Sequence, residues 1–182
     1  MVKIAFIHAR KGEHITGADL AFELKDKKII FVQSKRVDSK GRIHFNRFQL
    51  HKLIELEQQI CGAFSIFLPP SQSSSRAVFY QLIMQNEGQV EERFFHISEI
   101  AFVLGGRKSV HQREFLNQGL KLHEFQDMFW KCKVGGPDIR EDLKRDVFEF
   151  LSLVTNRLII WLNVENILGK VLRNDMSLKR AD

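Results

Sequence analysis

The sequence has few of the residues that mark fibrous, disulfide-rich or membrane proteins. Only 3 prolines and 11 glycines occur in 182 residues, which excludes a collagen-like or proline-rich polymer. The two cysteines, Cys61 and Cys132, are too few for a disulfide framework and too far apart for a CxxC motif. We therefore expect reduced thiols in a cytoplasmic protein.

Long apolar runs are also missing. The first residues are apolar only briefly before charged residues intervene, which is not typical of a secretory signal. The stretch 158–162 is far shorter than the roughly 20 residues that cross a bilayer, so no membrane partner is expected. Tyrosine is scarce as well, with one residue against 16 phenylalanines, and this predicts dry packing in the interior.

Positive charge is concentrated in one part of the chain. Residues 1–52 hold 12 basic and 5 acidic residues, a net charge of +7, whereas residues 53–182 hold 16 and 17, a net charge of −1. A polyanion such as a nucleic acid would therefore meet the N-terminal quarter of the chain. The alternative is a solvated basic face without a partner.

Hydrophobic periodicity predicts a mixed α/β fold. Two strands joined by a polar turn, an amphipathic helix, a further strand and a short helix are expected at 20–24, 29–37, 47–60, 61–68 and 97–104. Residues 77–84 fit either a strand or a helix. Helices at 113–133 and 139–154 and an apolar stretch at 158–172 make the C-terminal part helical. We expect a core over 1–108 and a helical extension over 109–182 packed on it as one compact domain.

The two strands of the predicted hairpin bring polar side chains together. A turn centred at Asp26 pairs residues whose numbers sum to 52, so Asp19 faces Gln33. Because side chains alternate along a strand, Lys35 shares that face, and Glu13 precedes Asp19 in a segment that can fold back towards it. One carboxylate, one amide and one lysine thus converge at one end of the hairpin.

This combination suits phosphodiester hydrolysis. The reaction needs a hard divalent cation held by oxygen ligands, an activated water and positive charge against the developing phosphorane. Asp19 and the Gln33 carbonyl can hold Mg²⁺, which Mn²⁺ can replace, Glu13 can complete the metal shell, and Lys35 can act on water and phosphate. In the alternative interpretation Asp19 caps a turn and the other side chains are solvated.

The same residues carry a resemblance to a known family. The segments Gly17-Ala18-Asp19 and Ile29 to Arg36, with VQSKR at its end, resemble the PD-(D/E)XK nuclease superfamily, and within it the Mrr-like restriction endonuclease branch, in which Gln replaces the acidic residue of the (D/E)xK motif. The resemblance spans roughly residues 12–68. It implies a restriction-endonuclease-like mixed β-sheet core flanked by helices, of the order αβββαβ, with a catalytic site of Asp19, Gln33, Lys35 and Glu13.

One part of the family pattern is missing. Members of the superfamily normally have a helix before the first strand that contributes a glutamate, and only 12 residues precede Glu13. That helix is absent, shortened or replaced by a strand over residues 2–8. The departure affects the role of Glu13 more than the other three positions.

Several further polar residues are candidates for nucleic-acid contacts. Gln49, near the start of the predicted amphipathic helix, either lies near the site or is simply a polar residue of the first helical turn. Basic side chains of the same region would contact phosphates, which fixes position without reading sequence, and they are Arg36, Arg42, Arg47 and Lys52. His44 and His51 could join them, although lone histidines are more often structural.

The sequence therefore predicts a metal-dependent DNA endonuclease, with DNA as partner and a homodimer as the assembly that supplies two active sites for a double-strand break. A catalytically inactive nuclease-fold module that binds nucleic acid or a protein is the alternative. A nuclease acting on RNA or branched DNA is a third interpretation.

Overall fold

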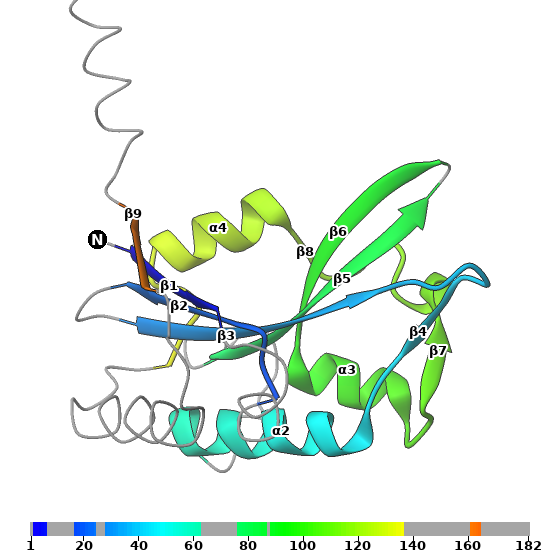
Figure 1. Ribbon diagram of the computed structural model, residues 1–182, viewed down its shortest axis with the longest axis horizontal. Helices are drawn as coiled ribbons and strands as arrows, with labels where there is room; N and C mark the ends of the chain where they lie inside the picture. The colour runs from blue at the N-terminus through cyan, green and yellow to red at the C-terminus, as the bar shows by residue number, and fades with distance from the viewer. Residues whose placement is uncertain are drawn as a thin grey trace, which may run out of the picture.

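A computed structural model describes residues 2–6, 17–24, 28–62, 76–86, 88–136 and 161–164. These residues form a mixed α/β structure built on one seven-stranded sheet of order β8-β6-β5-β3-β2-β1-β9 (Figure 1). The strands are β1 (Val2–Phe6), β2 (Leu20–Leu24), β3 (Lys28–Arg36), β5 (Val78–Asn86), β6 (Gln89–His96), β8 (Leu120–Lys121) and β9 (Trp161–Val164). Within the described ranges, no helix is long and apolar enough to cross a membrane.

The predicted hairpin register is observed. Leu20 pairs with Val32 and Phe22 with Ile30 in the antiparallel β2–β3 ladder, so paired numbers sum to 52 as expected. Beyond β3, the chain crosses over and returns as β5, which is parallel to β3 and places Gln33 beside Tyr80. The ambiguous segment at 77–84 is therefore a strand, and all other pairs in the large sheet are antiparallel.

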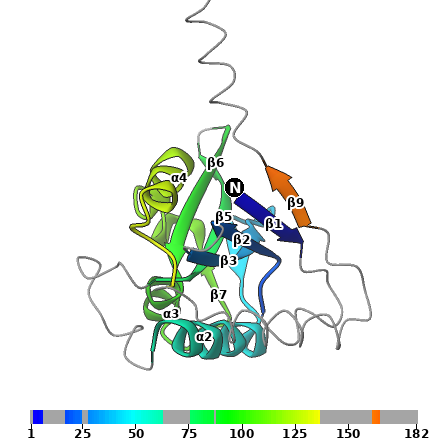
Figure 2. The same ribbon diagram turned by 90° about the vertical axis from the view of Figure 1, so that its left-hand side faces the viewer.

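Helices cover both faces of the sheet (Figures 1 and 2). The helices α2 (Arg47–Cys61) and α3 (Ile97–Leu104) lie on one face, and α4 (Leu122–Trp130) lies on the other. Because strand side chains alternate, β3 contributes Ile29 and Phe31 to the core beneath α2 and α3, and Ile30 and Val32 to the core beneath α4. A two-stranded sheet of β4 (Arg42–His44) and β7 (Ser109–His111) lies beside them.

The helices predicted at 47–60 and 97–104 are confirmed as α2 and α3, and capping interactions explain where each helix begins and ends. The Asn46 side chain accepts hydrogen bonds from the backbone N–H of Phe48 (2.9 Å) and Gln49 (3.4 Å), and Gly62 ends α2 at a φ of +92°. Before α3, the backbone N–H of His96 donates to Glu99 Oε2 at 2.8 Å, and Gly105 ends the helix in the left-handed region.

The long helix predicted at 113–133 is interrupted. The segment contains a 3₁₀ helix (Gln112–Glu114), the short strand β8 and only then α4. Asn117 and Gly119 have positive φ angles of 63° and 71°, and residues in this left-handed region cannot continue an α-helix. They therefore separate the 3₁₀ helix from α4. Cys61 ends α2 instead of beginning a strand, and residues 63–68 lie outside the described residues.

Most of the predicted C-terminal helices also lie outside the described residues, including the one expected at 139–154. Of the apolar stretch expected at 158–172, residues 161–164 form strand β9, which pairs antiparallel with β1. The described part of 109–136 joins the core closely: β7 pairs with β4, and β8 pairs with β6.

Candidate functional site

The end of the β2–β3 hairpin brings Asp19 and Gln33 into direct contact. Gln33 Nε2 donates to Asp19 Oδ2 at 2.6 Å, and the backbone N–H of Ser34 donates to the same oxygen at 2.9 Å. The backbone N–H of Asp19 in turn donates to Val32 O at 2.9 Å, which extends the β2–β3 ladder to this position. Gln33 is 2% exposed and Asp19 is half-buried, so the carboxylate lies at the boundary between core and solvent.

Gln49, in the first turn of α2, forms the other side of this cluster. Gln49 Nε2 donates to Gln33 Oε1 at 2.8 Å, and its side chain is buried beside it. Asn46 fixes where α2 begins and therefore which helix residue faces Gln33. Gly17 allows the chain to approach the helix here, since its φ is +73° and a Cβ atom would lie 2.7 Å from Gln49 O.

Lys35 follows Gln33 by two residues and therefore lies on the same face of β3. It is half-buried, whereas Arg36, on the opposite face, is exposed. Asp19, Gln33 and Lys35 are thus placed on one face of the hairpin end, as expected from the alternation of side chains. Glu13, the fourth expected site residue, lies outside the described residues.

Tyr80 belongs to the same cluster and was not among the residues singled out from the sequence. It lies beside Gln33 in the parallel β3–β5 ladder, is fully buried, and packs edge-on against Phe45 with ring centroids 5.3 Å apart. Burial and, to a lesser degree, the Asp19 carboxylate raise the pKa of its phenol, which stays neutral. Among the described residues its hydroxyl has no hydrogen-bond partner. The only tyrosine of the sequence, inside an apolar run, was the available signal.

A second chain of polar side chains starts at the same strand and lies on the opposite face of the sheet. Ser34 Oγ donates to Gln81 Oε1, and Gln81 Nε2 donates to Glu92 Oε1. Because Ser34 N also donates to Asp19, the candidate site is connected through the sheet to Gln81 and Glu92. Nothing in the sequence pattern pointed to this pairing, because it depends on the register of β5 against β6.

Of the expected phosphate-binding residues, Arg42 lies in β4 and Arg47 and Lys52 lie in α2, whereas Arg36 lies on the other face of β3 from Lys35. Arg42 donates to Ser109 Oγ at 2.7 Å, Arg47 donates to Gly106 O, and Lys52 pairs with Glu55 at 2.7 Å and lies over the Phe48 ring. Arg42 and Arg47 are exposed, and Lys52 is half-buried. Gln49 differs from them because it is buried and bonded to Gln33.

His44 lies 2.9 Å from Asp38, and both residues are near the surface. Hydrogen bonds from the backbone N–H of Arg42, and then from His44, lower the pKa of the Asp38 carboxyl to about 2. His51 lies 3.3 Å from Glu55. Both histidines are therefore paired with acidic side chains of their own segments.

The hairpin end offers the Asp19 carboxylate and, beside it, the Gln33 amide, which turns Nε2 and not Oε1 towards Asp19. The Asp19 carboxylate and the Gln33 amide are the kinds of ligand that Mg²⁺ accepts. Among the residues that the structure describes, no three His, Cys, Asp or Glu side chains gather closely enough to hold a metal ion. Comparison of the chain with models of protein families, with characterised proteins and with solved structures gives no match.

Proposed function

We propose that this protein is a metal-dependent nuclease that hydrolyses phosphodiester bonds of DNA at Asp19, Gln33 and Lys35. The observation that carries the proposal is the contact between Asp19 and Gln33, at 2.6 Å, on the face of β3 that also bears Lys35. The contact places a carboxylate, an amide and a lysine within one small part of the sheet, and this is the set of groups that metal-assisted phosphodiester hydrolysis uses.

The order of elements supports the same proposal. Three antiparallel strands, β1 to β3, are followed by α2 and by β5, which is parallel to β3. This is the strand, helix, strand order that a restriction-endonuclease-like core requires after its first helix. Residues 2–6 form the first of these three strands.

The site can offer two oxygen ligands to Mg²⁺ if the side-chain amides of Gln33 and Gln49 rotate. In the present arrangement Gln33 Nε2 faces Asp19, and Gln33 Oε1 faces Gln49 Nε2. If both amides turn by half a rotation, the bond between Gln33 and Gln49 is kept with donor and acceptor exchanged. Gln33 Oε1 then faces the side of Asp19, as a neutral ligand beside a charged one.

Within this proposal each residue has a separate task. Bound Mg²⁺ would supply positive charge and lower the pKa of a water molecule. Gln49 orients the Gln33 amide, Ser34 N holds the Asp19 carboxylate, and Lys35 offers positive charge to the attacking water and the phosphate. Arg42 and Arg47 lie on the exposed surface around α2 and would fix the DNA backbone.

Cleavage of supercoiled plasmid with Mg²⁺ or Mn²⁺ tests the proposal. We expect nicked or linear product with the wild-type protein, and loss of at least 100-fold in rate with Lys35→Ala and with Asp19→Asn. Lys40→Ala is the control, because Lys40 is an exposed lysine of the same basic segment and should leave the rate within about threefold. Intact plasmid, or a Lys35→Ala variant as fast as the wild type, would contradict the proposal.

A second candidate function is a nuclease-fold module that binds nucleic acid without cleaving it. The observation that favours it is that protein groups contact both ends of the Gln33 amide, Asp19 on one side and Gln49 on the other. The module would bind DNA in a salt-sensitive manner without a divalent cation, and Asp19→Ala would leave binding intact. Calorimetric titration with Mn²⁺ distinguishes the two candidates, since only the nuclease binds the ion in an Asp19-dependent manner.

The substrate class and assembly belong to the same proposal. A double-strand break needs two active sites, so we propose that the active form is a homodimer. Sedimentation measures the assembly, and parallel digests of duplex DNA, branched DNA and RNA determine the substrate. Equal cleavage of RNA and DNA would replace the DNA assignment with a general one.

A further inference from the structure

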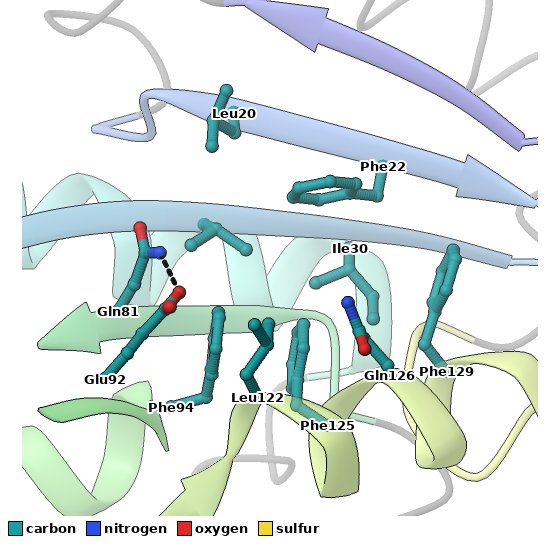
Figure 3. A pocket seen from close by; sticks show the side chains of 11 residues that line it. Leu20, Phe22, Ile30, Gln81, Glu92, Phe94, Leu122, Phe125, Gln126 and Phe129 are labelled. Carbon is teal, nitrogen blue, oxygen red and sulfur yellow. Dashed lines mark hydrogen bonds between the residues drawn. The ribbon is translucent and has the colours of Figure 1, made fainter. Parts of the chain in front are cut away.

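A cavity of about 150 Å³ lies on the opposite face of the sheet, between strands β2, β3, β5 and β6 and helix α4 (Figure 3). Its walls are mainly aromatic and aliphatic. Phe22 and Ile30 line it from the sheet, and Phe125 and Phe129 line it from α4. Two of the lining residues, Phe94 and Phe125, stack on each other with ring centroids 4.1 Å apart and an angle of 5° between their planes, so they line the cavity as one parallel pair of rings.

The volume fits one six-membered ring. A buried apolar cavity of about 150 Å³ is known to accept benzene, and complete drug-like ligands need about 300 Å³ or more. The half-exposed side chain of Leu122 (41% exposed) and the exposed Gln126 lie along α4 at the edge of this cavity. A single ring, alone or as the end of a larger molecule, therefore fits between α4 and the sheet.

One end of the cavity is polar. Gln81 and Glu92 line it there, and Gln81 Nε2 donates to Glu92 Oε1 (Figure 3). Both side chains are half-buried, so Glu92 brings a carboxylate to the edge of an otherwise aromatic cavity. A carboxylate in that position selects a group with N–H donors and disfavours an anion.

We propose that this cavity binds a six-membered aromatic ring that carries an amino or amidine group, with the ring against Phe94 and Phe125 and the N–H donors directed to Glu92. The aromatic lining and the ring-sized volume select the ring, and the carboxylate selects its substituent. The proposal does not depend on hydrolysis at Asp19, because the cavity and Lys35 lie on opposite faces of the sheet.

NMR titration of the full chain with benzamidine, toluene and benzoate tests the selection. We expect benzamidine to bind at least tenfold more tightly than toluene, and benzoate to bind more weakly than both, because Glu92 repels it. Glu92→Gln should remove the preference for benzamidine and leave the affinity for toluene within about twofold. Equal affinities for the three probes, or no binding of benzamidine, would overturn the proposal.

Two further variants test whether the probes bind in this cavity or elsewhere on the protein. Leu122→Trp places a large side chain at the edge of the cavity, on a half-exposed position that tolerates it, and should abolish binding of both benzamidine and toluene. Glu55→Gln removes a carboxylate of α2 on the other face and should change nothing. If Leu122→Trp binds benzamidine like the wild type, the ligand lies elsewhere and the proposal fails.

A comparison of cytidine with uridine identifies the source of the ring. The two nucleosides differ at the amino group, so at least tenfold tighter binding of cytidine indicates a nucleobase as the ligand. Binding of benzamidine without cytidine indicates a free aromatic amine or amidine. Lys35→Ala should leave all of these affinities unchanged, so failure of the cavity proposal and failure of the nuclease proposal give different results.

Discussion

The two faces of the central sheet bury different types of side chain. Beneath α2 and α3, the core contains buried polar side chains, among them Gln33, Gln49, Glu57 and Tyr80, each less than 10% exposed. Beneath α4, the buried cluster is made of aliphatic and aromatic side chains, including Phe79, Phe94, Phe125 and Phe129. The same strands supply both faces, because their side chains alternate.

The two faces therefore differ in how accurately their side chains must be positioned. Buried polar groups must find partners, so Gln33 and Glu57 each specify where neighbouring atoms lie. Aromatic rings only need to exclude water and fit together, and they leave a ring-sized cavity where the fit is incomplete. The proposed chemistry therefore lies on the polar face, and the proposed ring-binding cavity lies on the aromatic face.

Removing the Glu57 carboxylate should have the largest effect on stability. Glu57 is fully buried, its Oε2 accepts hydrogen bonds from the backbone N–H of Ala77 (3.0 Å) and Val78 (2.8 Å), and its Oε1 lies 3.1 Å from His96 Nε2. Glu57→Ala leaves these donors unpaired in the interior and should lower the free energy of unfolding by about 4 kcal/mol. Urea unfolding measures this loss.

The control is Glu55→Ala, in the same helix on its solvent side. Among the described residues Glu55 pairs with Lys52 and His51 near the surface, so the loss should be close to zero. Equal losses for the two variants would mean that the polar face does not depend on its buried partners.

A methyl group at Gly17 should be the next most damaging change. The φ of +73° is strained for alanine, and the new Cβ would overlap Gln49 O (2.7 Å) and Leu53 Cγ (2.9 Å). Gly17→Ala should cost about 3 kcal/mol in urea unfolding. Gly88→Ala separates backbone strain from overlap, because its φ is +79° and no atom of the described, non-neighbouring residues lies within 4 Å of the new Cβ; about 1 kcal/mol is expected.

On the aromatic face, Phe125→Leu should cost about 1.5 kcal/mol. The ring is 6% exposed and contacts Phe94 and Phe79, with centroids 4.1 and 5.1 Å away, so a smaller side chain loses contacts but keeps apolar burial. Phe102→Leu in α3 is the matched control, because Phe102 is 87% exposed and should cost almost nothing. Thermal unfolding followed by circular dichroism compares the two.

The smallest effect should come from Asp38, outside both faces. Its pKa is lowered to about 2 in the folded protein, below its ordinary value of 3.8, so its contribution to stability is present above pH 4. That contribution is lost as the pH falls from about 4 to 2. Asp38→Asn should therefore lower the melting temperature slightly at neutral pH, and by much less near pH 2, where the folded-state carboxyl is half protonated. A similar difference at both pH values would contradict this interpretation.

Local sequence signals found much of the structure around the site. The polar turn and β-branched residues of 29–37 fixed the hairpin and its register, and from the register came the approach of Asp19 to Gln33. Asn46 and Gly62 frame α2, and His96 and Gly105 frame α3, close to the predicted limits. The prediction of one helix over 113–133 was wrong because the spacing of apolar residues does not reveal a left-handed backbone conformation such as that of Asn117.

Contacts between distant segments could not be read from local signals. The sequence by itself determined the hairpin, the placement of Asp19, Gln33 and Lys35 on one face and the concentration of positive charge before residue 53, because turns, alternation and composition are local properties. Only the tertiary structure decided that Tyr80 lies beside Gln33, that Gln49 bonds to it, and that Glu92 reaches an aromatic cavity. These contacts depend on how the β3-to-β5 crossover and the β5–β6 register place strands that are far apart in the chain.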